Sequence, residues 1–384
     1  MHASPPPYLA AILENLESRS NEDAYVFLAD GERVGESATY SQMRRRVFNF
    51  ARLLRRSFPP GSRVVLALPP GVAFAVAFIG GLLSGCILVP VKPPGMRASR
   101  WRESLDNCLR DCAPAAIVTT PTYLDEIAAS LTADPTWRDI QWIAYQHDDS
   151  EASPLAEFPG EGEIAFIQYT SGSTSAPKGV RVSFRNLMAN AIIMRDALGQ
   201  SAETVFVSWL PLYHDMGLIG GVLQSAFLGS KYVFFAPANF LQKPERWLRA
   251  ISAYRATITA SPNFGFQHCV DRIDVERLGP LDLSSLSGGA CNGAEPVSAA
   301  TIERFVEKFA RFGVGDDFIR PVYGMAEATL MVSAAPRTEP VQLRAHVSET
   351  AVRSSPVVSC GFVRGDQEAI IVDPDAGARR PDRS

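Results

Sequence analysis

Short apolar segments alternate with helix-length segments along almost the whole chain of 384 residues. Apolar runs of about four to eight residues are typical of buried strands, and longer segments between them are typical of helices. The predicted strands are Tyr25–Ala29, Ala115–Thr119, Ile164–Tyr169, Thr204–Ser208, Tyr232–Phe235, Ala256–Thr259 and Phe318–Val322. The predicted helices are Ser41–Ser57, Trp101–Cys112, Phe184–Leu198, Pro244–Tyr254, Pro262–Asp271 and Pro296–Phe312. This alternation predicts an α/β fold of layered, largely parallel sheets with flanking helices.

One stretch, from Val64 to Val91, contains no charged residue and is long enough to cross a bilayer. Prolines and glycines interrupt it, which favours a buried strand (Arg63–Leu68), a packed helix (Val72–Ser84) and a second strand (Ile87–Val91). The first residues, Met1–Pro7, are too polar and too rich in proline for a signal peptide. We therefore expect no membrane span.

Composition excludes several classes of protein. With 46% hydrophobic and 20% charged residues, the chain can bury a sizeable core and is not a disordered tail or a fibre. Its 37 basic and 41 acidic side chains give a net charge of -4, so it does not bind nucleic acid through bulk positive charge. The six cysteines are scattered and form no C-x-x-C pair, which argues against a zinc site and predicts reduced thiols in a cytoplasmic protein.

The chain divides into two predicted α/β subdomains, residues 1–160 and 161–384. The acidic, proline-dotted stretch His147–Glu163 is the candidate linker, and Arg337–Pro356 is a second irregular stretch. Near the end, Glu368–Val372 is predicted to be a strand that enters a turn over Asp373–Gly377. Because no returning strand follows, we expect the chain to stop within a domain.

The strongest functional signal is the loop Tyr169–Gly179, with the sequence YTSGSTSAPKG. Its glycines can turn backbone N–H groups towards an anion, its hydroxyls add donors, and Lys178 adds positive charge, so the loop suits phosphate oxygens. The spacing is not that of a Walker A loop. A solvated Ser/Thr turn is the alternative interpretation.

The same loop closely resembles the phosphate loop of the adenylate-forming superfamily, which includes acyl-CoA synthetases and fatty acyl-AMP ligases. Three more segments resemble that superfamily's motifs, in the right order: Trp209–Gly221 (the histidine motif), Ser287–Val297 (the adenine pocket) and Tyr323–Thr329 (the tyrosine-glutamate motif). Within these segments, the sequences LYHDMGL, CNGAEPV and YGMAEATL are most similar to those of fatty acyl-AMP ligases. Ala326 stands where many relatives carry threonine. The irregular stretch Arg337–Pro356 occupies the place of that family's insertion, although it looks short.

The resemblance implies a ligase that uses ATP and Mg²⁺ to convert a medium- or long-chain fatty acid to an acyl-adenylate, releasing pyrophosphate. The acyl group would pass to an acyl carrier protein or a phosphopantetheine carrier domain, in lipid or polyketide biosynthesis. Two alternatives remain open: a fatty acyl-CoA ligase core, and a binding fragment that retains the pocket without chemistry. The superfamily's small C-terminal domain, with its lysine, is expected to be absent, as is the segment carrying a ribose-binding aspartate. We therefore expect weak activity from this chain alone.

The resemblance also implies a role for each motif residue. His214 would steer the carboxylate, Glu327 would bind Mg²⁺, and Lys178 would contact phosphate. The remaining nucleotide-binding residues would be Thr170, Ser171, Gly172, Ser173, Thr174, Gly288, Gly289, Ala290, Asn292, Tyr323, Gly324, Met325 and Ala326. The acyl chain would lie against Met216, Gly217, Gly220, Gly221, Asn263 and Phe264. Ordinary packing roles are the alternative for these residues. Asp215 is predicted to cap the following helix, with orientation of the His214 ring as the alternative.

Overall fold

The computed structural model describes residues 4–93, 98–131, 137, 139–153, 155–170, 178–336, 341–344, 357–373, 377 and 379, with the backbone alone for 98–104 and 127–131. Within these residues the strands form two large sheets and one small one. The six-stranded sheet has the order β6 (Gln141–Ala144), β5 (Ala116–Thr119), β3 (Arg63–Leu66), β4 (Ile87–Pro90), β7 (Ile164–Thr170) and β8 (Lys178–Ser183). Its strands run parallel except for the β7–β8 hairpin.

The nine-stranded sheet holds the second half of the chain together with two early strands. Its order is β17 (Phe362–Val363), β14 (Met331–Ala334), β13 (Ile319–Gly324), β12 (Gly289–Asn292), β11 (Ile258–Ser261), β9 (Val205–Ser208), β10 (Lys231–Phe235), β1 (Asp23–Leu28) and β2 (Val34–Thr39). The run from β1 to β13 is parallel, and antiparallel strands close both edges. A small antiparallel pair joins β15 (Leu343–Arg344) to β16 (Val357–Val358).

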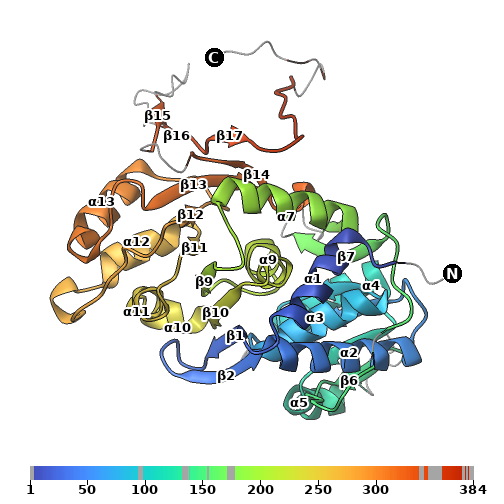
Figure 1. Ribbon diagram of the computed structural model, residues 1–384. Coiled ribbons are helices and arrows are strands. Elements are labelled where there is room, and N and C mark those ends of the chain that lie inside the picture. The colour runs from blue at the N-terminus through green and yellow to red at the C-terminus, as the bar shows by residue number, and fades with distance from the viewer. Residues whose placement is uncertain are drawn as a thin grey trace.

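Helices cover both large sheets (Figure 1), so the predicted layered α/β class is confirmed. In that view α11, α12 and α13 lie to the left of β9–β13, and α7 and α9 lie to the right. The helices are α1 (Pro7–Ser18), α2 (Tyr40–Ser57), α3 (Val72–Ser84), α4 (Ala98–Cys112), α5 (Pro121–Leu131), α7 (Phe184–Leu198), α8 (Asp215–Gly217), α9 (Gln224–Leu228), α10 (Pro237–Gln242), α11 (Glu245–Tyr254), α12 (Asn263–Arg272) and α13 (Ala299–Phe309). The described residues also form the π-helix η1 (Leu218–Leu223) and the 3-10 turns η2 (Val275–Arg277), η3 (Ala310–Phe312) and η4 (Ala326–Ala328).

The uncharged stretch folds as predicted, into β3, α3 and β4. Strand β3 pairs in parallel with β4, and nearly every residue of α3 is buried against its neighbours. Glycine is required within α3, because a Cβ at Gly81 would lie 2.4 Å from Leu88 Cδ2. No helix in the described part of the chain has the length and apolar character needed to cross a bilayer.

Local capping explains why several predicted helices begin where they do. Thr39 and Ser183 each form a capping box with the residue three positions later, at the start of α2 and α7. The predicted Pro296–Phe312 helix instead begins at Ala299, because Ser298 is its N-cap, and its end tightens into η3. These caps fix the helix that later lines the site, α7, at its predicted bounds.

The predicted strand Glu368–Val372 is wrong. Of this segment, Val372 alone forms a bridge, to Arg379, and the segment is otherwise without strand structure. Ile370 and Ile371 are 53% and 73% exposed, so no sheet face buries the apolar side chains that suggested a strand. The turn expected over Asp373–Gly377 and much of Arg337–Pro356 lie outside the described residues.

The predicted subdomain boundary near residue 160 stays a prediction, but the sheets exchange strands across it. Strands β1 and β2 join the nine-stranded sheet, whose other strands follow residue 204, whereas β7 and β8 join the six-stranded sheet. The edge strand of a sheet can form hydrogen bonds with any strand that lies beside it, wherever that strand stands in the sequence. The two sheets are therefore interlocked.

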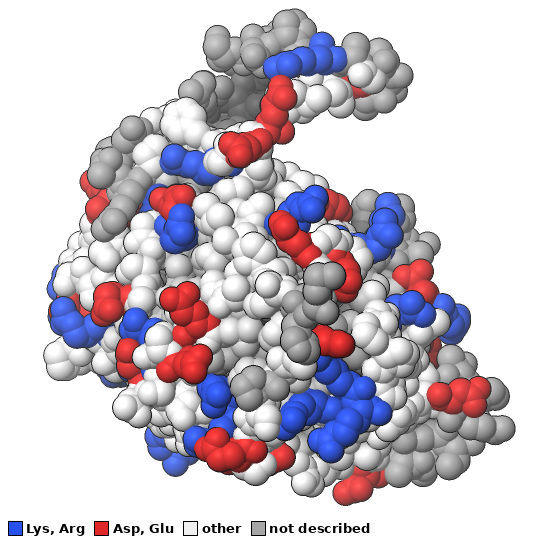
Figure 2. All heavy atoms as spheres, turned by 45° about the vertical axis from the view of Figure 1, so that its right-hand side comes forward, with Lys and Arg blue, Asp and Glu red and all other residues white. Residues whose placement is uncertain are grey.

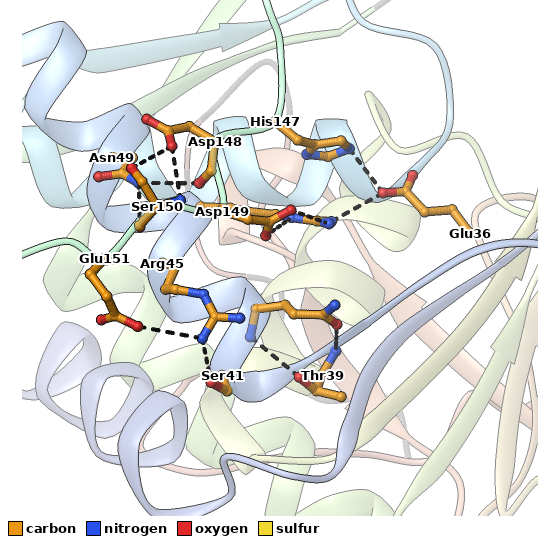
Figure 3. Close-up of polar contacts among 12 residues, drawn as sticks. Glu36, Thr39, Ser41, Arg45, Asn49, His147, Asp148, Asp149, Ser150 and Glu151 are labelled. Atoms are coloured by element: carbon orange, nitrogen blue, oxygen red, sulfur yellow. Dashed lines mark hydrogen bonds and ion pairs between the residues drawn. The ribbon is translucent and has the colours of Figure 1, made fainter.

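The predicted linker His147–Glu163 has no helix or strand among its described residues, but it is fastened to the core (Figure 3). The guanidinium of Arg46, on α2, donates to both carboxylate oxygens of Asp149, at 2.7 and 3.0 Å, and to Glu36 on β2 at 3.1 Å. His147 Nε2 lies 2.9 Å from the same Glu36 oxygen, and Asn49 donates to the backbone oxygens of Asp148 and Ser150. This segment is a strap across α2 rather than a loose connection.

We expect the strap to make stability depend on pH in acid. The hydrogen bonds from Arg46 lower the pKa of Asp149, so the pair contributes its full stability above about pH 4 and loses it as pH falls through the lowered value. Because Arg46 is buried, Arg46→Ala should cost about 1–3 kcal/mol at neutral pH. The matched control is Arg45→Ala, which breaks a 3.8 Å ion pair with the exposed Glu151 and a 3.1 Å hydrogen bond to Ser41, and should cost less than about 1 kcal/mol.

Urea unfolding at neutral pH and in stepwise acid measures both effects. The gap between the wild-type chain and Arg46→Ala should narrow as the pH falls below about 4. Equal losses for the two variants, or a gap that does not change with pH, would contradict this account of the strap.

Surface charge is mixed rather than of one sign. On the face shown in Figure 2, positive and negative side chains are interspersed between wide uncharged areas, with one local group of positive side chains in the lower part. This fits the small net charge of -4. Recognition of a partner therefore depends on local features rather than on the overall field.

Candidate active site

A cavity of about 250 Å³ lies beside the nine-stranded sheet, where α7 and the segment after β9 pack near β11–β13. Its walls are mostly apolar, with a few polar side chains among them. The lining residues are Met194, Leu198, Gln200, Phe206, His214, Asp215, Met216, Gly220, Ile258, Thr259, Ala260, Cys291, Ala294, Val322, Tyr323, Gly324, Met325, Leu330 and Met331. A site of this size and character suits an elongated apolar ligand with a polar head.

His214 stands on the turn that follows β9. Its N–H donates to Pro211 O at 3.1 Å, and its own carbonyl accepts from Leu218 N at 2.8 Å. The imidazole is 66% exposed and lies 3.6 Å from an Asp215 carboxylate oxygen, which itself accepts from Met216 N at 2.7 Å. Asp215 is itself the first residue of α8, whose N-cap position is His214 and which has no side-chain cap, so Asp215 does not cap this helix as predicted. The exposed imidazole is left free to meet a ligand.

The glycines after His214 have different surroundings. A Cβ at Gly217 would lie 2.2 Å from Pro211 O, and one at Gly221 would lie 2.5 Å from the Tyr232 hydroxyl. These two glycines let the helix pack closely against the core. Gly220 instead faces the cavity, where a Cβ would meet Leu330 Cδ2 alone, at 3.2 Å. It sits in the π-helical turn η1, a geometry frequent at functional sites.

Tyr323 and Met325 form an exposed platform at the end of β13. The Tyr323 side chain is 50% exposed and that of Met325 is 40% exposed, and both line the cavity with Gly324 between them. A tight loop holds this end, because Met325 N donates to Leu330 O at 2.9 Å and a Cβ at Gly324 would lie 2.0 Å from the same oxygen. An accessible phenol ring at a cavity mouth is available for stacking.

The segment predicted to bind adenine reaches the cavity in part. Cys291 and Ala294 line it, whereas Ala290 and Asn292 are buried in β12 beside it. Gly288 and Gly289 line other pockets, and Gly289 (φ +83°) packs under the side chain of Arg320. Burial raises the pKa of the Cys291 thiol to about 11, so this wall stays uncharged at neutral pH.

Asn263 and Phe264 lie outside the cavity lining. Asn263 joins α12 to α13 and β12, since its side-chain oxygen accepts from Ser298 N at 3.0 Å and from Asn292 Nδ2 at 3.3 Å. The Phe264 ring packs edge-on against Trp209, with ring centres 5.7 Å apart. An acyl-binding role for these two residues stays a prediction.

The hairpin strands on either side of the predicted phosphate loop are held next to the histidine motif. Thr170 and Lys178 face each other across the end of the β7–β8 hairpin. Gln168, on the same hairpin, donates to Tyr213 O at 2.9 Å, which ties it to the residue before His214. Ser171, Gly172, Ser173 and Thr174 lie outside the described residues.

Glu327 and Ala326 lie beside the main cavity, in a neighbouring pocket that also contains residues 180–182 of β8. Asn190 of α7 anchors this loop by donating to Ala328 O and Met331 O and by accepting from Met331 N. The Glu327 carboxylate is exposed and faces the strand that leaves the phosphate loop. Because Mg²⁺ usually takes one or two carboxylates and completes its shell with phosphates and water, this single carboxylate fits the ion. No group of three His, Cys, Asp or Glu side chains in the described part of the chain could hold a metal by itself.

Sequence reasoning missed most of the apolar wall. Met194 and Leu198 come from adjacent turns of α7, Ile258 and Ala260 from alternate positions of β11, and Leu330 from the loop after η4. Helical and strand periodicity marks such residues as buried, but a residue that lines a cavity has the same pattern as one that fills the core. Nothing in the local sequence separates the two.

Comparison with known proteins agrees with this architecture. The AMP-binding enzyme family matches residues 13–384. The medium-chain-fatty-acid–[acyl-carrier-protein] ligase JamA of Moorena producens is 32% identical, over 96% of this chain and 66% of its own length. The long-chain-fatty-acid–AMP ligase FadD23 of Mycobacterium tuberculosis is 34% identical, over 92% of this chain and 63% of its own length. A fatty acyl-adenylate ligase of L. pneumophila, solved with acyl adenylate and pyrophosphate, superposes with a TM-score of 0.84 at 34% identity, over 96% of this chain and 65% of that one.

The fold and the ordered motifs around the cavity define the large N-terminal domain of an adenylate-forming enzyme. The chain belongs to the AMP-binding enzyme family, and the relatives and the solved structure given above are fatty-acid ligases. It spans about two thirds of the length of those relatives.

Proposed function

We propose that this chain activates a fatty acid with ATP to form an acyl-adenylate, releasing pyrophosphate, and that the acyl group then passes to an acyl carrier protein. The observation that carries the proposal is one cavity shared by His214, Tyr323 and an apolar wall. An acyl-adenylate has three parts that match these features: a mixed anhydride for His214, an adenine ring for Tyr323 and a hydrocarbon chain for the apolar wall.

In this proposal, the residues of the cavity and of its neighbouring segments each have a chemical task. Tyr323 stacks on adenine, and Gly324 and Met325 bound the same pocket. The His214 imidazole meets the fatty carboxylate where it attacks the α-phosphorus. Thr170 and Lys178, with the loop between them, hold the outgoing phosphates, and developing charge there is stabilised by donors and cations aimed at phosphate oxygens. Glu327 would hold Mg²⁺, which would neutralise phosphate charge when bound.

Incubating the chain with a fatty acid, ATP and Mg²⁺ tests the proposal, with acyl-adenylate and pyrophosphate measured by mass spectrometry and a coupled assay. His214→Ala should lower product formation at least about tenfold, a loss of ~1.4 kcal/mol in transition-state stabilisation. The matched control is His268→Ala, because His268 does not line the cavity and instead contacts Leu241 O and the Phe240 ring. Equal product from the two variants would remove His214 from the mechanism.

Product analysis with added coenzyme A and with a carrier protein separates the two acceptors. Acyl-adenylate that accumulates despite coenzyme A, and that is consumed by the carrier, supports the proposal. Acyl-CoA as the main product would make the chain a fatty acyl-CoA ligase core. Binding of an acyl-adenylate mimic without any turnover would make it a binding fragment.

A further inference from the structure

The cavity is closed at the end away from Tyr323 by the segment that connects α7 to β9. Ile258 pairs with Gly289 and Ala290 pairs with Ile319, so the level of Ile258 corresponds to Phe318. Tyr323 is five residues further along the strand, which is roughly 16 Å at ~3.3 Å per residue. Gln200 lines the cavity together with Ile258 and precedes β9, so it lies at the end remote from the Tyr323 platform.

Gln200 is part of a thin partition. Leu198, Gln200 and Ile258 line both the main cavity and a second pocket of about 140 Å³, which also contains Glu203 and Thr204. The three side chains thus separate an apolar cavity from a polar pocket. Leu198 belongs to α7 and Ile258 to β11, whereas Gln200 extends from the connection between α7 and β9.

A second glutamine fixes the Gln200 side chain in this position. Gln224 Nε2 donates to Gln200 Oε1 at 2.8 Å and to Ala191 O at 3.1 Å. Gln224 is 2% exposed, and the Gln200 backbone N–H donates to Arg195 O at 2.9 Å. Because both its backbone and its amide are held, Gln200 is a rigid stop rather than a mobile surface side chain.

The cavity volume sets the length of chain that fits in front of this stop. At ~30 Å³ for each group of the size of a water molecule or a methylene, the 250 Å³ cavity holds about eight such groups in all. Because the adenylate takes up part of the cavity beside His214 and Tyr323, about eight carbons is the upper limit for the acyl chain. We propose that the site selects medium-length acyl chains of no more than about eight carbon atoms, and that Gln200 is the residue that sets this limit. The inference rests on the proposed function, since it assigns the apolar cavity to the acyl group.

Calorimetric titration with non-hydrolysable acyl-sulfamoyl adenosines, from six to sixteen carbons, tests the inference without requiring turnover. For the wild-type chain, each added methylene should tighten binding roughly fourfold until the chain reaches about eight carbons. Longer mimics should then bind no better, or more weakly. Affinity that continues to rise through sixteen carbons would overturn the proposed limit.

Variants at the stop identify the responsible residue. Gln200→Ala should open the partition and move the preferred length by about four carbons, given the 140 Å³ pocket behind it. Gln200→Asn, which keeps the amide and shortens the side chain, should give a smaller shift in the same direction. Gln200→Leu keeps the bulk and should keep the limit. Gln141→Ala, at the exposed start of β6, is the control and should leave the length profile unchanged.

The outcomes separate the two proposals. If mimics bind but Gln200→Ala and Gln200→Asn leave the preferred length unchanged, Gln200 is not the stop and the proposed function stands. If the wild-type chain binds no mimic of any length, the proposed function fails, and the length limit fails with it.

Discussion

Replacing Tyr323 with alanine is expected to weaken binding of an acyl-adenylate mimic about five- to 150-fold, since loss of base–aromatic stacking costs roughly 1–3 kcal/mol. The ring is half exposed at the cavity mouth, so its removal should leave the fold intact. Tyr323→Phe is the matched control, because it keeps the stacking face and removes a hydroxyl whose contact is a 3.7 Å approach to Met325 Sδ. Calorimetry gives the affinities, and thermal unfolding checks that the variants remain folded.

The Tyr323 prediction also states which ligands should respond. AMP and the acyl-adenylate mimic share the adenine ring, so Tyr323→Ala should weaken both by a similar factor. Loss of affinity for the acyl mimic with unchanged affinity for AMP would place the ring against the acyl chain instead, and would contradict the assignment of Tyr323 to adenine.

Filling the cavity from Gly220 should weaken binding of the acyl-adenylate mimic but not binding of AMP. Gly220→Leu places a branched side chain into the space where an acyl chain would lie, and displacement of even three methylenes should cost about 2.4 kcal/mol, or roughly 60-fold in affinity. Gly220→Ala, whose Cβ meets a flexible leucine end at 3.2 Å, should have a much smaller effect. Affinity for AMP should change little in either variant.

Gly221 provides the structural control for this series. Its Cβ would lie 2.5 Å from the Tyr232 hydroxyl inside the core, so Gly221→Ala should lower the free energy of unfolding by about 1–3 kcal/mol. If Gly220→Leu were to destabilise the chain as much as Gly221→Ala and to weaken AMP and acyl mimic equally, the acyl assignment of the cavity would be contradicted.

Much of the fold could be predicted from sequence, because local rules decide it. The capping boxes at Thr39 and Ser183, and the uncharged run that becomes β3, α3 and β4, each depend on neighbouring residues. The strand predicted over Glu368–Val372 is wrong because strand formation depends on residues that are distant in the sequence. A strand exists through its hydrogen-bonded partner, and local β-propensity does not supply one.

The candidate site could be predicted in its polar parts and not in its apolar ones. His214 and Tyr323 stand in motifs with unusual residue types, so sequence marks them, and the cavity contains both. Gly217, Gly220 and Gly221 look alike in sequence, yet Gly220 alone of the three lines the cavity. Gln200 carried no signal, because its importance comes from the pocket on its other side.

The most direct test of the central claim is a crystal structure of this chain with a non-hydrolysable acyl-adenylate mimic of about eight carbons. We predict the adenine stacked on Tyr323, the anhydride position beside His214, and the hydrocarbon chain between α7 and β11, ending at Gln200. A mimic bound elsewhere, or an acyl chain that leaves this cavity empty, would contradict the account.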